Sequence, residues 1–515
     1  MLFNSFSYLV FLPIVFLLYW TVPVKFRKVL LLVASYFFYM SWKWEYGFLI
    51  AGLTIVNYFI GAKIDSVDPE KQPAKRKGIL VAGLVFNLGC LCFYKYATFL
   101  LDSFVSLANW GRALVAHGAS VSEWHSPAVN IILPLGISFF TFEFIHYIVD
   151  IHRGSRPVKG FIDFALFASF FPSQIAGPVK RFQDFMQQMG EAPVFKSHQF
   201  RAGIFLIMQG MFKKVALGDN LGQFVAPGFD HINQLTIIDS WLLAVLFLLQ
   251  MYFDFAGYTD IGRGSALVLG YKVPENFRLP FLASNLTDFW RRWHISLSTW
   301  LRDYLFIPLG GSRNGHWIVN RNIFLTMALG GLWHGAAWRF VIWGMLHGFG
   351  LLADKEWRRI VDGIPALAKL RPNPLWHWSG VLFTFVFLAM VTLFFRVSDM
   401  IQGLSIWGRM YGIATGGAHL DLGLNLASGV VSSLLYTSPV PLLLPAYGIF
   451  CLAHHYCLQL DLGKADKTKI NPALAQILAF WDQSPALRTS TCLAVALIIF
   501  GFAPGKLFPF LYFQF

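Results

Sequence analysis

Two histidines stand in sequence surroundings that suit acid–base or nucleophilic chemistry. His334 lies in the stretch 330–335, Gly-Gly-Leu-Trp-His-Gly, within a run that is otherwise apolar from Ile323 to Trp338. Small residues flank it on both sides, so a substrate can approach the imidazole closely. A neutral buried histidine bonded to a carbonyl is the alternative, but ionisable side chains inside apolar membrane segments are functional by default. We therefore expect His334 to be catalytic.

The second histidine, His294, lies in the stretch 286–305, where aromatic and basic residues separate at helical spacing. One face of a helix would carry Leu286, Phe289, Trp290, Trp293, Leu297, Trp300 and Leu301, and the stripe beside it would carry Arg291, His294, Ser298 and Arg302. This pattern predicts one amphipathic helix at the membrane interface. A simple interfacial anchor explains the Trp and Arg residues but not His294. We therefore keep His294 as the second catalytic candidate.

Other polar residues end apolar runs. Asp254 follows a strongly apolar stretch, and intramembrane acids usually face a cavity, although a structural pair with a nearby backbone group or Arg is the alternative. Lys213 and Lys214 end another apolar run, where they either snorkel to the interface or meet an anionic ligand. Arg291 and Arg292 add positive charge that suits phosphate groups.

Several familiar catalytic signatures are missing. The sequence contains no G-x-S-x-G elbow, no Walker A loop and no H-E-x-x-H motif. It also offers no set of three or four well-spaced metal ligands, so we predict a site without metal. A self-contained serine hydrolase, ATPase or zinc protease is disfavoured.

The elements that must position these residues are membrane helices. Of the 515 residues, 56% are hydrophobic and only 13% are charged, which is more apolar surface than a soluble domain can bury. Apolar runs lie at about 7–23, 29–42, 47–62, 79–100, 130–150, 161–178, 202–217, 236–256, 321–352, 376–395, 432–457 and 489–504. Several are short, and the Pro- and Gly-bearing segments 133–136 and 171–178 predict broken or re-entrant backbone. No linker or soluble region interrupts the chain, so we predict one integral membrane domain, 1–515.

The net charge of +14 is distributed as the positive-inside rule expects rather than as a nucleic-acid surface. Basic clusters lie at 25–28, 63–77 and 153–159, between alternate apolar runs. These loops are therefore expected to face the cytoplasm, which places the N-terminus on the periplasmic side of a bacterial inner membrane. No nucleic-acid partner is expected.

At these motifs the sequence resembles the membrane-bound O-acyltransferase superfamily, and most closely its branch for bacterial polysaccharide acetylation, which includes the alginate O-acetyltransferase membrane subunit. The matching stretches are 94–97, 133–139, 170–172, 175–178, 210–215, 254–258, 275–277, 289–304, 330–335 and 512–515. Of these, the tract from 289 to 335 is highly specific.

The resemblance implies that His334 is the superfamily's essential intramembrane histidine and that His294 is its second marked position. It implies an all-α fold of about 11 transmembrane helices, with re-entrant and interfacial helices around a central tunnel. It also implies acyl transfer with acetyl-CoA as the donor. The residues expected to bind substrate or donor are Arg291, Arg292, Lys213, Lys214, Asp254, Trp333 and Asn276. The expected partners are a periplasmic or membrane-anchored SGNH-type acetyltransferase, the polysaccharide export machinery and membrane lipid.

These observations predict a membrane O-acetyltransferase that passes acetyl groups from a cytoplasmic donor to an exported polysaccharide, alginate or a similar polymer. A transporter or channel for an acyl donor or polymer is the alternative from another class, because broken helices and intramembrane polar residues suit it too. Acyl transfer to teichoic acid or lipid is a third possibility. The sequence leaves open whether transfer is direct or passes through an acetyl-histidine.

Overall fold

The structure is a computed structural model that describes residues 1–115, 123–127 and 131–413, apart from residues 176, 192 and 314. A few isolated residues beyond 413 are also described, among them Val431 and Leu511. The apolar runs expected at 432–457 and 489–504 lie wholly or largely outside the described residues, and so does the motif at 512–515.

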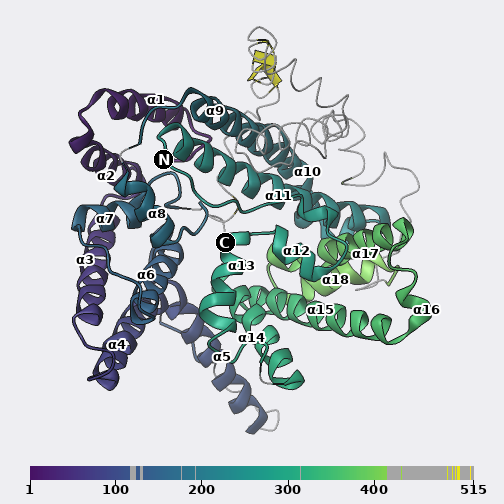
Figure 1. Cartoon of the computed structure of the whole chain (residues 1–515). Coiled ribbons are helices and arrows are strands. Elements are labelled where there is room, and N and C mark those ends of the chain that lie inside the picture. Colours follow the sequence, from purple (N-terminus) through teal and green to yellow (C-terminus); the bar gives the residue numbers. More distant parts are fainter. Residues whose placement is uncertain are drawn as a thin grey trace.

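All regular secondary structure in the described part of the chain is helical, as the sequence predicts (Figure 1). Its first half contains α1 (Phe6–Thr21), α2 (Val24–Met40), α3 (Glu45–Asp65), α4 (Pro73–Leu91), η1 (Cys92–Tyr96), α5 (Ala97–Val115), α6 (Ile137–His152), α7 (Phe161–Ser169), α8 (Phe182–Gly190), α9 (Ser197–Met211), η2 (Phe212–Asp219) and α10 (Asn220–Asp230). Its second half contains η3 (Ile232–Gln234), α11 (Ile237–Val268), η4 (Pro280–Leu282), α12 (Leu286–Arg292), α13 (Ile295–Leu301), η5 (Arg302–Phe306), α14 (His316–His334), α15 (Trp338–Gly363), α16 (Pro365–Ala368), α17 (Pro374–Thr392), η6 (Leu393–Phe395) and α18 (Met400–Met410).

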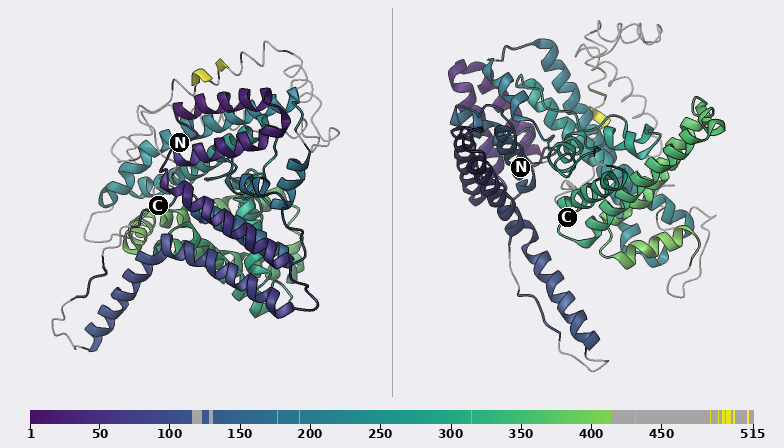
Figure 2. Two further views of the ribbon diagram at one scale, coloured as in Figure 1. Left: turned by 90° about the vertical axis from the view of Figure 1, so that its left-hand side faces the viewer. Right: turned by 60° about the horizontal axis from the view of Figure 1, so that its bottom comes forward.

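Four helical segments of the described chain are long and apolar enough to cross a membrane. They are Glu45–Asp65, Pro73–Val115, Ile237–Val268 and Pro374–Phe395. Helix α1 is apolar but shorter. Helix α5 projects away from the rest of the molecule in both views of Figure 2. The fold is therefore that of a polytopic membrane protein, while the number of about 11 spans stays a prediction.

The irregular segments expected at 133–136 and 171–178 are confirmed. Helix α7 ends at Ser169, and the described residues from there to Arg181 form no regular helix and are largely buried. Side chains from distant helices bind this backbone, because the Ser35 hydroxyl accepts the Phe171 N–H at 3.1 Å and Ser296 accepts the Val179 N–H at 3.0 Å. Buried protein groups thus satisfy the irregular backbone, as membrane depth requires.

Two apolar stretches break where they carry the candidate histidines, and the prediction of one helix over 286–305 is wrong. The run 321–352 forms two antiparallel helices, α14 and α15, because Gly335 adopts an extended conformation directly after His334. The stretch 286–305 is not one helix but three short pieces, α12, α13 and η5, and it breaks at Trp293 and His294. Each break falls at a histidine that the sequence marks as catalytic.

The core of the described residues comprises two large apolar clusters. One joins α1, α2, α6 and α7 to the end of α11, and the other joins α10 and the first part of α11 to α17 and α18. In Figure 1, α11 runs between these two halves of the molecule, with α14 and α15 side by side below it. A smaller cluster around Trp333, Trp300 and Phe142 lies beside them.

Candidate active site

His294 occupies the break between α12 and α13 in a strained backbone conformation. Its φ of 44° and ψ of 51° lie in the left-handed region, which non-glycine residues rarely adopt. Its side chain is fully buried. Such conformations cost about 1–3 kcal/mol and persist where surrounding contacts impose them, often at functional sites.

Asn276 imposes the break. Its backbone carbonyl accepts the Ile295 N–H at 3.0 Å, and its side-chain oxygen accepts the Ser296 N–H at 3.2 Å and the Ser296 hydroxyl at 2.7 Å. Two residues later, the Arg278 N–H donates to the Arg292 carbonyl at 2.9 Å. The extended segment around Asn276 therefore takes backbone bonds that a continuous helix would need, and it turns His294 toward the core.

The ring of His294 has aromatic neighbours. Its centroid lies 4.8 Å from the ring of Phe255 and 6.1 Å from the ring of Trp333. Neither ring nitrogen makes a hydrogen bond to another described residue. Buried polar groups are nearly always hydrogen-bonded, so this exception leaves bonding capacity for a ligand or water.

His334 is the last residue of α14 and is also enclosed by aromatic rings. Trp333, Trp343 and Phe395 lie 5.0, 5.1 and 5.2 Å from its ring centroid. Helices α14 and α15 approach closely here, because a Cβ atom at Gly331 would lie only 2.2 Å from the Phe340 carbonyl oxygen. Gly331 thus allows close contact between the two helices, whereas the open approach to the imidazole expected from the sequence stays a prediction.

The structure brings the two histidines together around Trp333. The indole ring contacts both imidazoles, and His294 and His334 are close enough to interact electrostatically. Lys95 and His347 are also close enough to His334 to interact with it electrostatically. Lys95 is not among the predicted site residues, although it lies in the family-matching stretch 94–97 and is the only charged residue in the apolar run 79–100. That isolation is a recognisable signal of function in a membrane segment.

A line of aromatic contacts runs from His334 to a cavity. Trp343 contacts His334, His347 contacts Trp343 at 4.6 Å, and Phe387 contacts His347 at 5.7 Å. Phe387 also lines a cavity of about 790 Å³ between α15, α17 and the segment before α12. The indole nitrogen of Trp343 and Nδ1 of His347 are buried and have no partner among the described residues.

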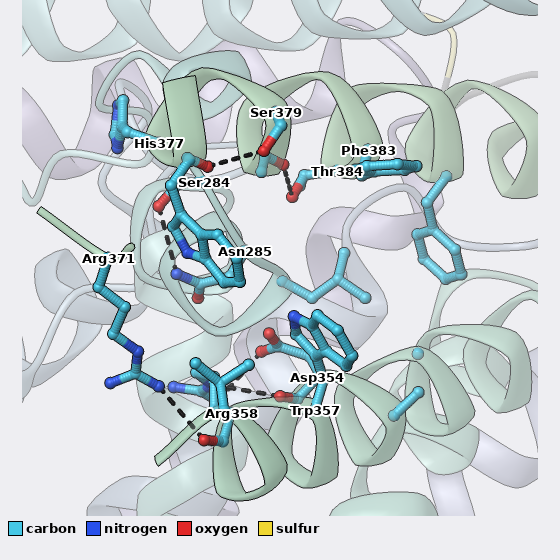
Figure 3. Close-up of a pocket in the computed structure, with 17 residues that line it drawn as sticks. Ser284, Asn285, Asp354, Trp357, Arg358, Arg371, His377, Ser379, Phe383 and Thr384 are labelled. Carbon is cyan, nitrogen blue, oxygen red and sulfur yellow. Dashed lines mark hydrogen bonds and ion pairs between the residues drawn. The ribbon is translucent and has the colours of Figure 1, made fainter. Parts of the chain in front are cut away.

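Figure 3 shows the polar side of this cavity. Arg358 and Arg371 lie along one edge, and the Arg371 guanidinium donates to the Arg358 carbonyl at 3.2 Å. The rings of Trp357 and Trp376, both lining residues, are nearly parallel with centroids 6.4 Å apart. Neither His294 nor His334 lines this cavity.

The candidates Lys213, Lys214 and Asp254 form a separate buried cluster between η2 and α11. Lys213 pairs with Asp260 at 2.7 Å, and Lys214 pairs with Asp219 at 2.6 Å and with Asp254. These pairs favour the structural alternative for the acids. Because both ammonium groups are already neutralised in the interior, we no longer assign them to donor phosphates.

The two arginines of α12 differ in their surroundings. Arg292 pairs with Asp288 at 2.9 Å, one helical turn earlier, whereas Arg291 is exposed. No group of three or more His, Cys, Asp or Glu side chains that suits a metal ion occurs among the described residues. The metal-free site stays a prediction.

The fold and this site define a class: a polytopic helical membrane protein with two histidines buried in an aromatic core. Residues 152–396 match the profile of MBOAT, the membrane-bound O-acyltransferase family. The chain is 36% identical to the probable alginate O-acetylase AlgI of Azotobacter vinelandii and 38% identical to that of Pseudomonas putida, with 99% of both chains covered in each case. It is 34% identical to the peptidoglycan O-acetyltransferase of Helicobacter pylori, over 78% of each chain.

The chain belongs to the membrane-bound O-acyltransferase family and is an O-acyltransferase. This relatedness decides against the transporter or channel that the sequence left as an alternative.

Proposed function

We propose that this protein takes acetyl groups from cytoplasmic acetyl-CoA and passes them across the inner membrane to an exported polysaccharide, alginate or a similar polymer. The two relatives that match over 99% of their length are named probable alginate O-acetylases, which supports this substrate class. The observation that carries the proposal is the enclosure of His334 by Trp333, Trp343 and Phe395, next to His294.

The chemistry needs a base. The acceptor hydroxyl oxygen forms a bond to the thioester carbonyl carbon, the carbon–sulfur bond breaks, and the thiolate leaves. In this proposal His334 accepts the hydroxyl proton, or its ring nitrogen first attacks the carbonyl and carries the acetyl group transiently. The proton ends on the departing sulfur in either route. His294 donates a hydrogen bond to the carbonyl oxygen while negative charge develops there.

The donor needs a site for its phosphate-bearing end, because that end carries charges that do not cross an apolar core. The cavity between α15 and α17 supports this role. Arg358 and Arg371 pair with Asp354 and Asp362 at 3.0 and 2.7 Å, but unlike the buried lysines they are partly exposed, so their guanidinium groups keep donors that can reach a phosphate. Trp357 offers an aromatic face. The contacts through Phe387 connect its wall to the rings around His334. We therefore assign the donor's phosphate-bearing end to this cavity, with Arg291 as a further candidate contact.

The proposed orientation has a periplasmic N-terminus and an inner-membrane location. The basic segments assigned to the cytoplasm lie on one face, because Lys28 pairs with Asp163 at 2.9 Å and Arg76 donates to the Ile151 carbonyl at 2.8 Å. The polymer lies on the opposite side. A periplasmic or membrane-anchored SGNH-type acetyltransferase would then complete the transfer, near the export machinery.

The test uses purified protein in lipid nanodiscs with acetyl-CoA, an SGNH-type partner and a polymer fragment. We expect release of the CoA thiol and acetylation of the polymer, with loss of both in His334→Ala. A chelator should leave the rate unchanged. Absence of thiol release, in a sample that contains the folded protein and the SGNH-type partner, would refute acetyl-CoA as the donor.

A further inference from the structure

The last turn of α14 carries His334 and has carbonyl groups that need partners from outside the helix. An α-helix leaves its last four carbonyl oxygens without intrahelical donors. Gly335 follows in an extended conformation, with φ of −165° and ψ of 155°, so no further helical turn supplies them. In an apolar interior an unsatisfied carbonyl group is costly. The conformation of His334 therefore depends on what binds the carbonyls just before it.

Two consecutive residues of η1 bind two consecutive carbonyls of this turn. The Tyr96 hydroxyl donates to the Leu332 carbonyl at 2.9 Å, and the Lys95 ammonium donates to the Trp333 carbonyl. Lys95 also donates to the Ser138 hydroxyl at 3.1 Å, which ties the same ammonium group to the first turn of α6. The contact thus joins three helices directly before His334.

The element that supplies these donors is unusual. Segment η1 is a π-helix of five residues that interrupts the long apolar segment Pro73–Val115. Single turns of π-helix occur frequently at functional sites. A lysine inside such an apolar segment is costly and needs a compensating role. A positive charge at the C-terminal end of a helix is favourable, because the helix dipole leaves partial negative charge there.

We propose that Lys95 and Tyr96 are positioning residues, which hold the last turn of α14 so that the His334 ring is presented to the reacting groups. The proposal rests on the proposed catalytic role of His334. Lys95 does not itself exchange a proton or contact the acetyl group in this scheme. It acts through the Trp333 carbonyl, one peptide unit before the catalytic residue.

The test compares kcat with the donor KM in the acetyl-CoA assay on purified, folded variants. Lys95→Met should lower kcat about 10- to 100-fold, because a misplacement of about 1 Å can cost two orders of magnitude. The donor KM should stay within about twofold, since binding of the donor is not affected. Lys95→Arg keeps a cationic donor and should restore kcat to within about tenfold of the unmodified protein.

A matched pair of tyrosines gives the control. Tyr39 also donates its hydroxyl to a backbone carbonyl, that of Leu135, at 2.9 Å, but this acceptor belongs to the segment before α6 and not to α14. Tyr96→Phe should lower kcat about 3- to 10-fold, whereas Tyr39→Phe, which removes an equivalent hydrogen bond, should leave kcat unchanged. Equal kcat in the two variants would overturn the proposal, even where Lys95→Met fails to fold.

The outcomes separate this proposal from the proposed function. If His334→Ala is inactive and Lys95→Met keeps full kcat, the positioning role is wrong and the acetyl transfer stands. A selective rise in the donor KM for Lys95→Met would also overturn it, because Lys95 would then contact the donor. If His334→Ala keeps full activity, the proposed function itself fails.

Discussion

Two buried polar regions of this protein use their hydrogen-bonding capacity in opposite ways. In the cluster between η2 and α11, each lysine is neutralised by carboxylates, as in the pair of Lys213 with Asp260 at 2.7 Å. Around Trp333, both ring nitrogens of His294 lack a partner among the described residues, and so does the indole nitrogen of Trp343. The neighbours there are aromatic rings.

The difference distinguishes structural from chemical use of polar residues in a membrane interior. A paired cluster fixes one arrangement of helices, and the loss of one partner leaves an uncompensated buried charge. Unpartnered donors are unfavourable in the resting protein, but they can bind a substrate without first breaking a bond to the protein. The strained backbone of His294 is consistent with the second use.

The largest effect is expected for His334→Ala. Polymer acetylation should fall by at least about 10²- to 10⁴-fold, the range for loss of a general base, with more for loss of a nucleophile. The amount of protein in the membrane should stay normal, since the neighbours of His334 pack on one another. His316→Ala is the matched control, because His316 lies on the same helix at its exposed N-terminal end. Normal acetylation by the His334 variant would show that the region around Trp333 does not carry out the chemistry.

Lys214→Met tests whether the paired cluster between η2 and α11 has a structural role. It leaves Asp219 and Asp254 without their cation, and breaking a buried pair in this way costs about 3–5 kcal/mol. We expect much less protein in the membrane and a lower unfolding temperature, with activity per folded molecule unchanged. The measurements are quantitative blotting of membranes and thermal unfolding of the purified variant. A stable protein with a raised donor KM would instead assign Lys214 to donor binding.

His294 allows a finer distinction between ring chemistry and backbone shape. His294→Ala should reduce acetyl transfer about 10²-fold or more, because one donor toward the carbonyl oxygen is lost. His294→Asn should retain part of the activity, since an amide can donate the same bond and Asn tolerates the left-handed conformation that this position requires. Equal activity of the two variants would show that the amide does not replace the ring. Initial rates of CoA release measure both.

The sequence predicted the membrane fold from long apolar runs, and it marked both histidines as candidates from a histidine among small or aromatic residues, because these features are local. It did not predict the break at His294, since the helical spacing of apolar residues continues through 286–305. That break depends on Asn276, which is 18 residues away in the chain and acts through Ser296. The partners of Lys213 and Lys214 were equally hidden, because Asp254 and Asp260 lie on another helix.

The cavity between α15 and α17 provides a smaller test. If it holds the phosphate-bearing end of the donor, Arg371→Gln and Trp357→Ala should raise the donor KM about three- to tenfold and leave kcat unchanged, as expected when uniform binding is lost. The rate should be measured at saturating and limiting acetyl-CoA. An unchanged KM in both variants would exclude this cavity as the donor site, and Arg291 would become the candidate to test next.

The smallest effect concerns an exposed carboxylate outside both regions. Asp399 caps α18, and the hydrogen bond from the Gln402 N–H, at 2.8 Å, lowers the pKa of this carboxylate, with a further contribution from the Ser398 hydroxyl. Because the folded protein favours the charged form, the cap stabilises the protein above the unfolded pKa, and this stabilisation is lost as the pH falls through the folded pKa. Asp399→Ala should therefore lower the unfolding temperature at pH 7 by at most about 2 °C, and the difference from the unmodified protein should shrink as the pH falls through the lowered pKa of Asp399. Asp399→Asn, which keeps a capping oxygen, should show a smaller difference at pH 7. If Asp399→Ala lowered the unfolding temperature as much as Lys214→Met, burial and pairing would not determine how much a charged residue stabilises this protein. The paired cluster would then not differ from the exposed surface.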